Sequence, residues 1–178
     1  MASTSTFGLL AEFDSASQLY KACEGVRDEG FTKWDAHTPF PVHGLDRAMG
    51  LSRSKLPFIV LVMGLLGACG GFALQTWIHT EAYPMIFSGK PYWSWPAFIP
   101  VTFECGILFA SFGAVFGMFV LNGLPQTYHP VFNSERFERV TDDKFFISIE
   151  AVDPKYDAEA TRLLLEKLGA AHVESLEN

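Results

Sequence analysis

Two uninterrupted apolar runs constrain what this chain can fold into more than any other feature of its sequence. Residues 58–77 carry no formal charge, and at about 1.5 Å per residue these roughly 20 residues match a hydrocarbon core of about 30 Å. Residues 97–121 form a second run whose only formal charge is Glu104. A buried helix pair in a soluble protein is the alternative, but two runs of this length are rare there. The pattern therefore predicts a transmembrane hairpin.

The hairpin is predicted to occupy residues 57–124, with helices at about 58–78 and 97–122 and an outer loop at 79–96. The loop and its flanks hold amphipathic aromatic residues, which favour the headgroup layer of a bilayer. These residues are Trp77, Tyr83, Tyr92, Trp93 and Trp95. The loop is therefore expected to be a short interfacial turn rather than a domain.

The residues before the hairpin, 1–56, show a β-α-β pattern. An apolar run at 6–14 predicts a strand, and Ser15 then precedes a helical pattern that Gly30 closes. Residues 31–38 alternate well enough to form a second strand. This half of the chain is thus expected to supply two strands and one helix.

A short amphipathic helix is predicted at residues 42–50, between this pattern and the hairpin. Its apolar side chains are Leu45, Ala48 and Met49. Because the segment lies next to a membrane-entering helix, we expect it to lie on the inner membrane surface with these side chains toward the lipid.

The residues after the hairpin, 125–178, repeat the β-α-β pattern behind a linker at 125–141. Residues 144–152 are the most strand-like run in the sequence, 157–170 show helical periodicity, and 172–176 can form a last strand. The second half therefore matches the first in order and size.

The most economical fold is an α+β membrane protein, in which the two-helix hairpin is inserted into a split ferredoxin-like domain with βαβ from each end. Two independent domains of about fifty residues are the alternative, but neither could bury much apolar surface alone. The pattern leaves the order of the strands in the sheet open.

Positive charges predict the orientation of the hairpin. Arg47, Arg53 and Lys55 crowd the entry to the first helix, whereas the connecting loop carries only Glu81 and Lys90. The first six residues are small and polar, so no secretory signal is expected at this end. Both termini and the split domain are therefore expected in the cytoplasm.

Small residues form a stripe along each predicted membrane helix. At about 100° per residue they fall on one face, where they let helix backbones approach closely. The first helix has Gly64, Gly67, Ala68 and Gly71, and the second has Gly106, Ala110, Gly113 and Gly117. The two stripes are predicted to pack against each other.

Glu104 lies on the opposite side of the second helix from this stripe, on the side of Ser111 and Asn122. A carboxylate there would face lipid unless another protein covers it, so the chain is expected to have a membrane partner. Two roles remain open for Glu104. It can exchange protons along a path to a partner, or it can fix docking through hydrogen bonds.

Gln75 and His79 lie one turn apart near the end of the first helix and are predicted to be interfacial hydrogen-bonding groups. They are weaker candidates for a proton path or for docking. A membrane haem needs axial ligands within the span, and His79 is the only histidine near one. No cofactor is therefore expected in this chain.

The remaining composition excludes several classes of function. With 13 Lys and Arg against 20 Asp and Glu, and no basic patch, nucleic-acid binding is not expected. The histidines and three cysteines lack the spacing of a metal or iron–sulfur site. Nucleotide-binding, zinc-hydrolase and serine-hydrolase motifs are also absent from the sequence. The carboxylate groupings Asp35 with His37, and Asp142 with Asp143, are more typical of a solvated face.

Three passages resemble a known family. They are PVHGLDRAMG at residues 41–50, GKPYWSWPAFIPVTFE at 89–104 and LPQTYHPVF at 124–132. With the order of the other features, they make the chain similar over essentially its whole length to the ActD subunits of bacterial alternative complex III, a quinol:electron acceptor oxidoreductase.

The resemblance implies an accessory integral subunit that is not an enzyme by itself and has no cofactor of its own. The expected partners are quinol-binding multi-helix membrane subunits, cytochrome c subunits and an iron–sulfur subunit in the bacterial inner membrane. Haem c, iron–sulfur clusters and quinol would belong to those partners, and Glu104 matches the carboxylate of the family's PxTFE passage. A free-standing two-helix sensor or transporter component, with a small ligand-binding α/β domain, is the alternative.

Overall fold

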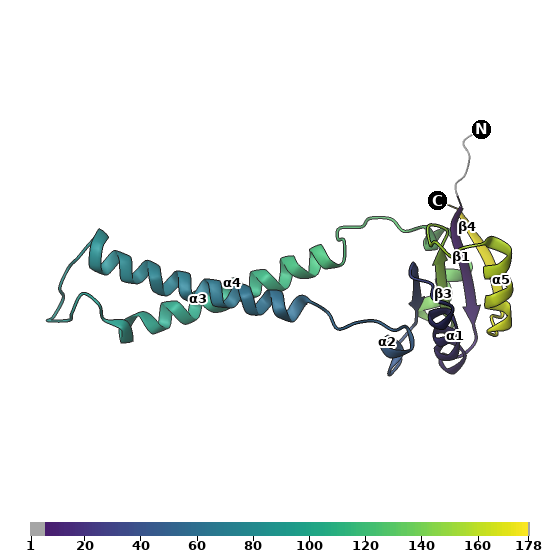
Figure 1. Cartoon of the computed structure of the whole chain (residues 1–178), viewed down its shortest axis with the longest axis horizontal. Helices are drawn as coiled ribbons and strands as arrows, with labels where there is room; N and C mark the ends of the chain where they lie inside the picture. The colour runs from purple at the N-terminus through teal and green to yellow at the C-terminus, as the bar shows by residue number, and fades with distance from the viewer. Residues whose placement is uncertain (1–5, 178) are drawn as a thin grey trace, which may run out of the picture. The chain divides into compact units, whose positions relative to one another are not determined.

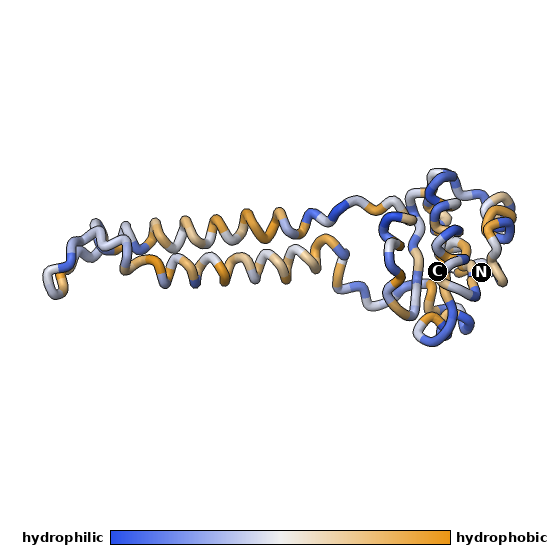
Figure 2. Tube along the Cα trace, turned by 90° about the horizontal axis from the view of Figure 1, so that it is seen from below, coloured by the Kyte–Doolittle hydropathy of each residue, from blue (hydrophilic) through white to orange (hydrophobic). Residues whose placement is uncertain are grey.

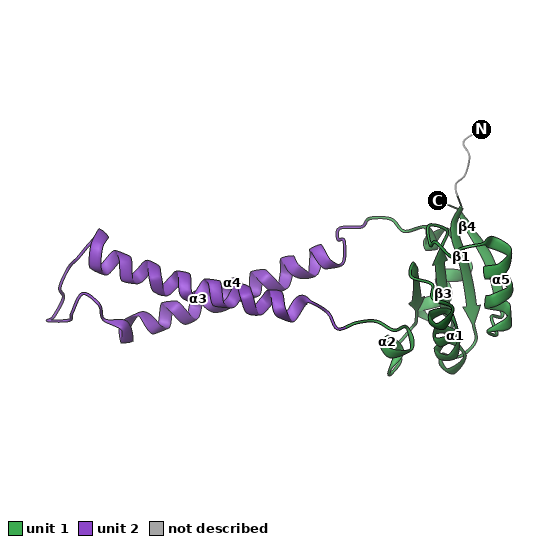
Figure 3. Ribbon diagram, in the orientation of Figure 1, with its two compact units in different colours: residues 1–52, 127–178 green, residues 53–126 purple. Residues whose placement is uncertain are grey.

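A four-stranded sheet and a pair of long apolar helices form the two units into which this chain divides (Figure 1, Figure 3). The computed structural model describes residues 6–177. The sheet unit takes the chain up to Ser52 and again from Thr127 onward, and the helix unit is Arg53–Gln126.

The sheet unit is built from two β-α-β stretches. The first comprises β1 (Thr6–Phe13), α1 (Ala16–Glu29) and β2 (Trp34–His37), and the second comprises β3 (Phe145–Glu150), α5 (Ala158–Lys167) and β4 (His172–Glu177). The strand order is β2-β3-β1-β4, and all three neighbouring pairs are antiparallel. The predicted mixture of helices and strands is confirmed.

Local capping explains where both helices begin and where α1 ends. Ser15 accepts a hydrogen bond from the Gln18 N–H (3.3 Å) before α1, and Asp157 accepts one from the Ala160 N–H (2.9 Å) before α5. Gly30 ends α1 in the left-handed conformation, at a φ of 82°. β1, β2 and β3 are shorter than the predicted runs, because pairing stops before the apolar pattern does, whereas β4 extends one residue beyond the predicted 172–176.

The main core lies on the face of the sheet that α1 and α5 cover. Its buried side chains include Leu9, Phe13, Ile147, Leu19 and Leu165. The short helix α2 (Leu45–Ala48) also belongs here, since Ala48 is fully buried and Leu45 and Met49 pack against this core. The structure thus differs from the expected lipid-facing helix, because the apolar face of α2 is covered by the protein itself.

The second face of the sheet is covered by a segment that the sequence analysis assigned to a linker. Two 3-10 helices, η2 (Pro130–Asn133) and η3 (Arg136–Thr141), bring Val131 and Phe137 onto this face. These side chains pack with Leu10, Phe146 and Leu176 of the strands. We call residues 130–141 the covering segment. Much of the expected linker is therefore part of the folded domain.

The helix unit is an antiparallel pair. The first helix runs through α3 (Leu56–Trp77) into the π-helical turn η1 (Ile78–Ala82), and the second is α4 (Trp95–Leu121). Both are 27 residues long and apolar enough to cross a membrane (Figure 2). The connecting loop is therefore shorter than the predicted 79–96, because the helix continues through residue 82.

Few side chains of the two helices are buried within the chain itself. In the most apolar window of each, only 11% and 6% of the residues are buried. A core helix of a soluble protein would be mostly buried, so these proportions disfavour the soluble alternative. Most of the apolar surface of the helix pair is therefore not covered by the described residues, and it is available to contact lipid or another protein.

Asp153, just after β3, ties two loops of the sheet unit together. Its buried carboxylate accepts hydrogen bonds from the backbone N–H groups of Thr32 (2.6 Å), Lys33 (2.7 Å) and Lys155 (2.8 Å). Burial alone would raise the pKa of Asp153, but these donors outweigh it and hold the pKa below its usual value. The α1–β2 and β3–α5 loops are thus held by one charged acceptor.

We predict that Asp153→Ala lowers the free energy of unfolding by about 2 kcal/mol, because it leaves buried N–H donors without an acceptor. Chemical unfolding of the full chain in mild detergent, followed by near-ultraviolet circular dichroism, measures the change. Glu159→Ala, which removes an exposed carboxylate from α5, is the matched control. Equal stability of the two variants would contradict the role given to Asp153.

Candidate functional site

The helices α3 and α4 meet along a seam of small residues. An added Cβ at Gly67 would come within 2.4 Å of the Cys105 carbonyl oxygen, and one at Gly113 within 2.9 Å of the Met63 Cβ. The predicted small residues that lie at this seam are Gly64, Gly67, Ala68, Gly71, Gly106, Ala110, Gly113 and Gly117. The backbones are therefore close enough that a larger side chain has no room.

Glu104 lies outside this seam and is exposed on α4. It lines a shallow, mostly apolar groove with Pro100, Phe103, Ile107 and Ser111, among others. Among residues 6–177 it has no hydrogen-bond or ion-pair partner, and the Ser111 hydroxyl instead donates to the Ile107 carbonyl (2.9 Å). The described residues therefore provide neither a hydrogen-bond donor nor a cation to the Glu104 carboxylate.

The other residue predicted on the Glu104 side, Asn122, does not line this groove. It ends α4, where its backbone N–H donates to the Met118 carbonyl (3.0 Å). The structure therefore brings Ser111 and Glu104 to one surface and leaves Asn122 apart from them.

Gln75 forms a polar clasp between the two helices. Its side-chain amide donates to the carbonyl of Phe98 (3.1 Å) and to the Thr102 hydroxyl (3.4 Å) on α4, as well as to Gly71 in its own helix. His79 lies one turn further on, and its Nδ1 donates to the Gln75 carbonyl (2.9 Å). The structure thus brings Gln75 and His79 together, and both are part of the junction between the helices.

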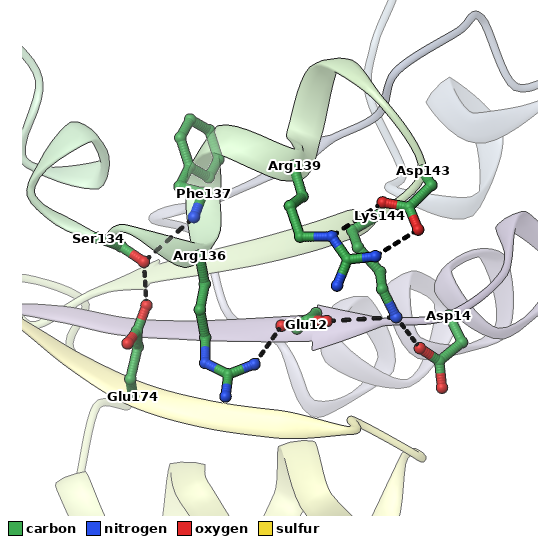
Figure 4. Close-up of polar contacts among 9 residues, drawn as sticks. All are labelled: Glu12, Asp14, Ser134, Arg136, Phe137, Arg139, Asp143, Lys144 and Glu174. Atoms are coloured by element: carbon green, nitrogen blue, oxygen red, sulfur yellow. Dashed lines mark hydrogen bonds and ion pairs between the residues drawn. The ribbon is translucent and has the colours of Figure 1, made fainter.

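The second face of the sheet carries a charged cluster that the sequence analysis missed (Figure 4). Glu12, only 5% exposed, pairs with Arg136 (3.1 Å) from the covering segment and with Lys144 (3.4 Å). Lys144 also pairs with Asp14, and Ser134 bonds Glu174 on β4. In the sequence, the only sign of this cluster is the carboxylate of Glu12 within the apolar run of the predicted first strand. These contacts hold the covering segment to the sheet.

His37 links the edge strand β2 to this face. Its Nε2 lies 3.0 Å from the Ser148 hydroxyl, and its ring meets Phe137 edge-on at 5.1 Å between centroids. Burial lowers the pKa of His37, Asp35 opposes this, and His129 adds to the lowering. Asp35 and Asp143 thus lie exposed as expected, with Asp143 paired to Arg139, whereas His37 is partly buried and contacts Ser148.

No described residues form a ligand set for a metal. Within residues 6–177, no three His, Cys, Asp or Glu side chains lie together as metal ligands would. Cys23 is buried in the sheet unit, whereas in the helix unit Cys69 is exposed and Cys105 lies at the seam. The polar clusters of both units join segments of the fold to one another.

Fold and site together define a class: a mixed α/β protein with an apolar helical hairpin, whose polar groups join its segments. A family model described as alternative complex III, ActD subunit, matches residues 7–175, and the chain belongs to this family. A comparison with curated proteins gives no match. The resemblance found in the sequence is confirmed. The chain is thus a subunit of a multi-subunit respiratory electron-transport complex, and its two candidate spans suggest a membrane location.

We predict that Gly67→Val destabilises the helix pair by about 1–3 kcal/mol, because the new side chain would overlap the backbone of α4. The thermal unfolding midpoint of the full chain in mild detergent measures this. Gly70→Val is the matched control, since a Cβ at Gly70 meets nothing within 4 Å. Equal losses in the two variants would show that the seam does not hold the hairpin.

We also predict that the stability of the chain falls as the pH drops below about 6.5, the ordinary pKa of histidine. The unfolded chain then binds a proton that the folded His37 resists, since its folded pKa is lowered. His37→Gln should flatten this dependence between pH 7.5 and 5.5 in chemical unfolding. The exposed His43→Gln is the control, and a dependence that His37→Gln leaves unchanged would exclude His37 as its source.

Proposed function

We propose that this chain is a cofactor-free accessory subunit that spans the bacterial inner membrane with its hairpin and stabilises the quinol-binding subunits of alternative complex III. The observation that carries the proposal is Glu104, an exposed and unpartnered carboxylate within a membrane-length apolar helix of the described chain. Membership of the ActD family supports it. Haem c, iron–sulfur clusters and quinol would then lie in the partner subunits.

The position of Glu104 argues for a protein neighbour. It lies about two and a half turns after Trp95, where α4 begins, and its nearest groove residues are apolar. A charged residue at such a depth costs on the order of 3 kcal/mol when it faces lipid. A partner helix that offers a hydrogen-bond donor or a cation removes this cost. We therefore propose docking as the main role of Glu104.

A proton path is the second role that we consider for Glu104. The Ser111 hydroxyl lies in the same groove, and Gln75 and His79 form a polar junction elsewhere in the hairpin. A carboxylate within a membrane span that a partner covers can pass protons to a neighbouring site. If Glu104 serves docking, its substitution should reduce assembly of the complex. If it serves proton transfer, assembly should stay normal while proton movement is impaired, so Glu104→Gln distinguishes the two roles.

For the sheet unit, we propose the ferredoxin-like topology and a cytoplasmic location. Two β-α-β stretches with the antiparallel order β2-β3-β1-β4 support the topology, and the hairpin lies in the chain between β2 and β3. Arg47, Arg53 and Lys55 before α3 support the orientation with both termini in the cytoplasm. A free-standing sensor is the competing function, but a chain without a membrane partner would leave the Glu104 carboxylate facing lipid.

We predict that the wild-type chain, captured in mild detergent from its native membrane, brings down haem c and quinol:cytochrome c reductase activity. Glu104→Gln should lower the recovered haem about fivefold, because a neutral amide forms a weaker hydrogen bond than a carboxylate. A pyridine haemochrome spectrum and the reductase assay measure both. Glu81→Gln, at a carboxylate of the π-helical turn, is the matched control.

The outcomes separate the alternatives. Normal recovery of Glu104→Gln with impaired proton movement across proteoliposomes would replace docking by the proton path. A wild-type chain that emerges alone and colourless, under conditions that keep other respiratory complexes intact, would contradict the accessory role and favour the free-standing sensor.

A further inference from the structure

A small cavity lies at the loop end of the hairpin, within the helix unit. Its lining includes His79 from the π-helical turn, Phe87, Lys90 and Ser94 from the loop, and Phe98 from α4. The loop is folded by a tight turn in which the Lys90 N–H donates to the Phe87 carbonyl (3.1 Å). Ser88 and Gly89 both have positive φ values, 52° and 74°, as a type I′ turn requires. The chain itself thus shapes this site.

The imidazole of His79 is held in one orientation and one tautomer. Its Nδ1 donates to the Gln75 carbonyl (2.9 Å), and a carbonyl can only accept. In the neutral ring, Nε2 is therefore left as a hydrogen-bond acceptor. The ring also lies against Phe98, with 5.0 Å between centroids, and Gln75 is itself bonded to α4. His79 can thus accept a hydrogen bond from a hydroxyl without rearrangement.

Lys90 gives the cavity its charge. No carboxylate lines it among the described residues, and Lys90 forms no ion pair with residues 6–177. The remaining lining is mostly apolar, with Met85, Phe87 and Pro91 beside Phe98. One cation, one fixed acceptor and apolar walls suit a ligand with an anionic group, a hydroxyl and a hydrocarbon part.

The surroundings indicate where such a ligand would come from. Exposed aromatic side chains lie in the sequence on both sides of the cavity residues, and amphipathic rings of this kind favour the headgroup layer. They are Trp77, Tyr83, Tyr92, Trp93 and Trp95. A ligand at that depth is most simply a lipid of the bilayer.

We propose that this cavity binds the headgroup of phosphatidylglycerol, with the phosphate against the Lys90 ammonium and a glycerol hydroxyl donating to His79 Nε2. The inference rests on the proposed membrane insertion of the hairpin. Phosphatidylglycerol carries a net negative charge and free hydroxyls. A choline headgroup has no donor, and an ethanolamine headgroup brings its own cation toward Lys90, so both should bind more weakly.

Native mass spectrometry of the full chain in mild detergent, titrated with each lipid, tests the proposal. We expect phosphatidylglycerol to bind more than fivefold more tightly than phosphatidylcholine, and Lys90→Gln to lower this ratio about fivefold, since one lysine near a lipid surface contributes about that factor. Lys55→Gln, which removes a lysine before the other end of the hairpin, is the matched control and should keep the preference.

A second variant tests the proposed hydrogen bond from the lipid hydroxyl to His79. His79→Phe keeps a ring beside Phe98 but removes the acceptor, so it should weaken phosphatidylglycerol and leave phosphatidylmethanol, an anionic lipid without a hydroxyl, unchanged. Circular dichroism of each variant shows whether it is folded. If His79→Phe weakens both lipids equally, the hydroxyl contact is overturned.

The remaining outcomes separate this inference from the one on which it rests. Equal binding of all lipids, equal loss in Lys90→Gln and Lys55→Gln, or displacement of the lipid by soluble glycerol phosphate would overturn the lipid site. Extraction of the chain from its membrane by alkaline carbonate would overturn membrane insertion itself. A chain that resists carbonate and prefers phosphatidylglycerol through Lys90 supports both.

Discussion

The close approach of α3 and α4 at their small residues is the contact on which the helix unit depends. Gly67 faces the backbone of α4 at Cys105, so the pair can meet only where side chains are minimal. The larger side chains consequently lie on the outer surfaces, which is why so little of either helix is buried within the chain. A seam of this kind frees the remaining surface for other contacts. Glu104 and the apolar groove around it are part of that freed surface.

The sheet unit is stabilised differently, through two unlike faces. One face has an apolar core under α1 and α5, whereas the other combines Phe137 and its neighbours with the buried carboxylate of Glu12. Leaving Glu12 unpaired there would be costly, and its cations come from the covering segment and from Lys144. The residues that follow the hairpin therefore complete the fold of this unit, and a simple tether would not provide these contacts.

Sequence reasoning succeeded where one local signal decides the outcome. Long apolar runs located both membrane-length helices, and Ser15 and Gly30 located the start and the end of α1. It failed for the covering segment, since Val131 and Phe137 show no helical or strand period. It also misplaced α2, because an apolar helix face does not reveal whether lipid or protein covers it. The Glu12 cluster depends on contacts across more than a hundred residues, such as the 124 that separate it from Arg136, and no local pattern encodes these.

The strand order has a consequence for biosynthesis. β1 and β2 are not neighbours in the sheet, because β3 lies between them, and β3 follows the whole hairpin in the chain. The segment that leaves the ribosome first therefore contains no pair of strands that bond to each other in the finished protein. Its apolar faces stay uncovered until translation has passed both long helices. The sheet can thus form only after both helices of the hairpin have been synthesised. A chain whose translation stops within α4 contains β1 and β2 but lacks β3 and β4, the strands with which they pair.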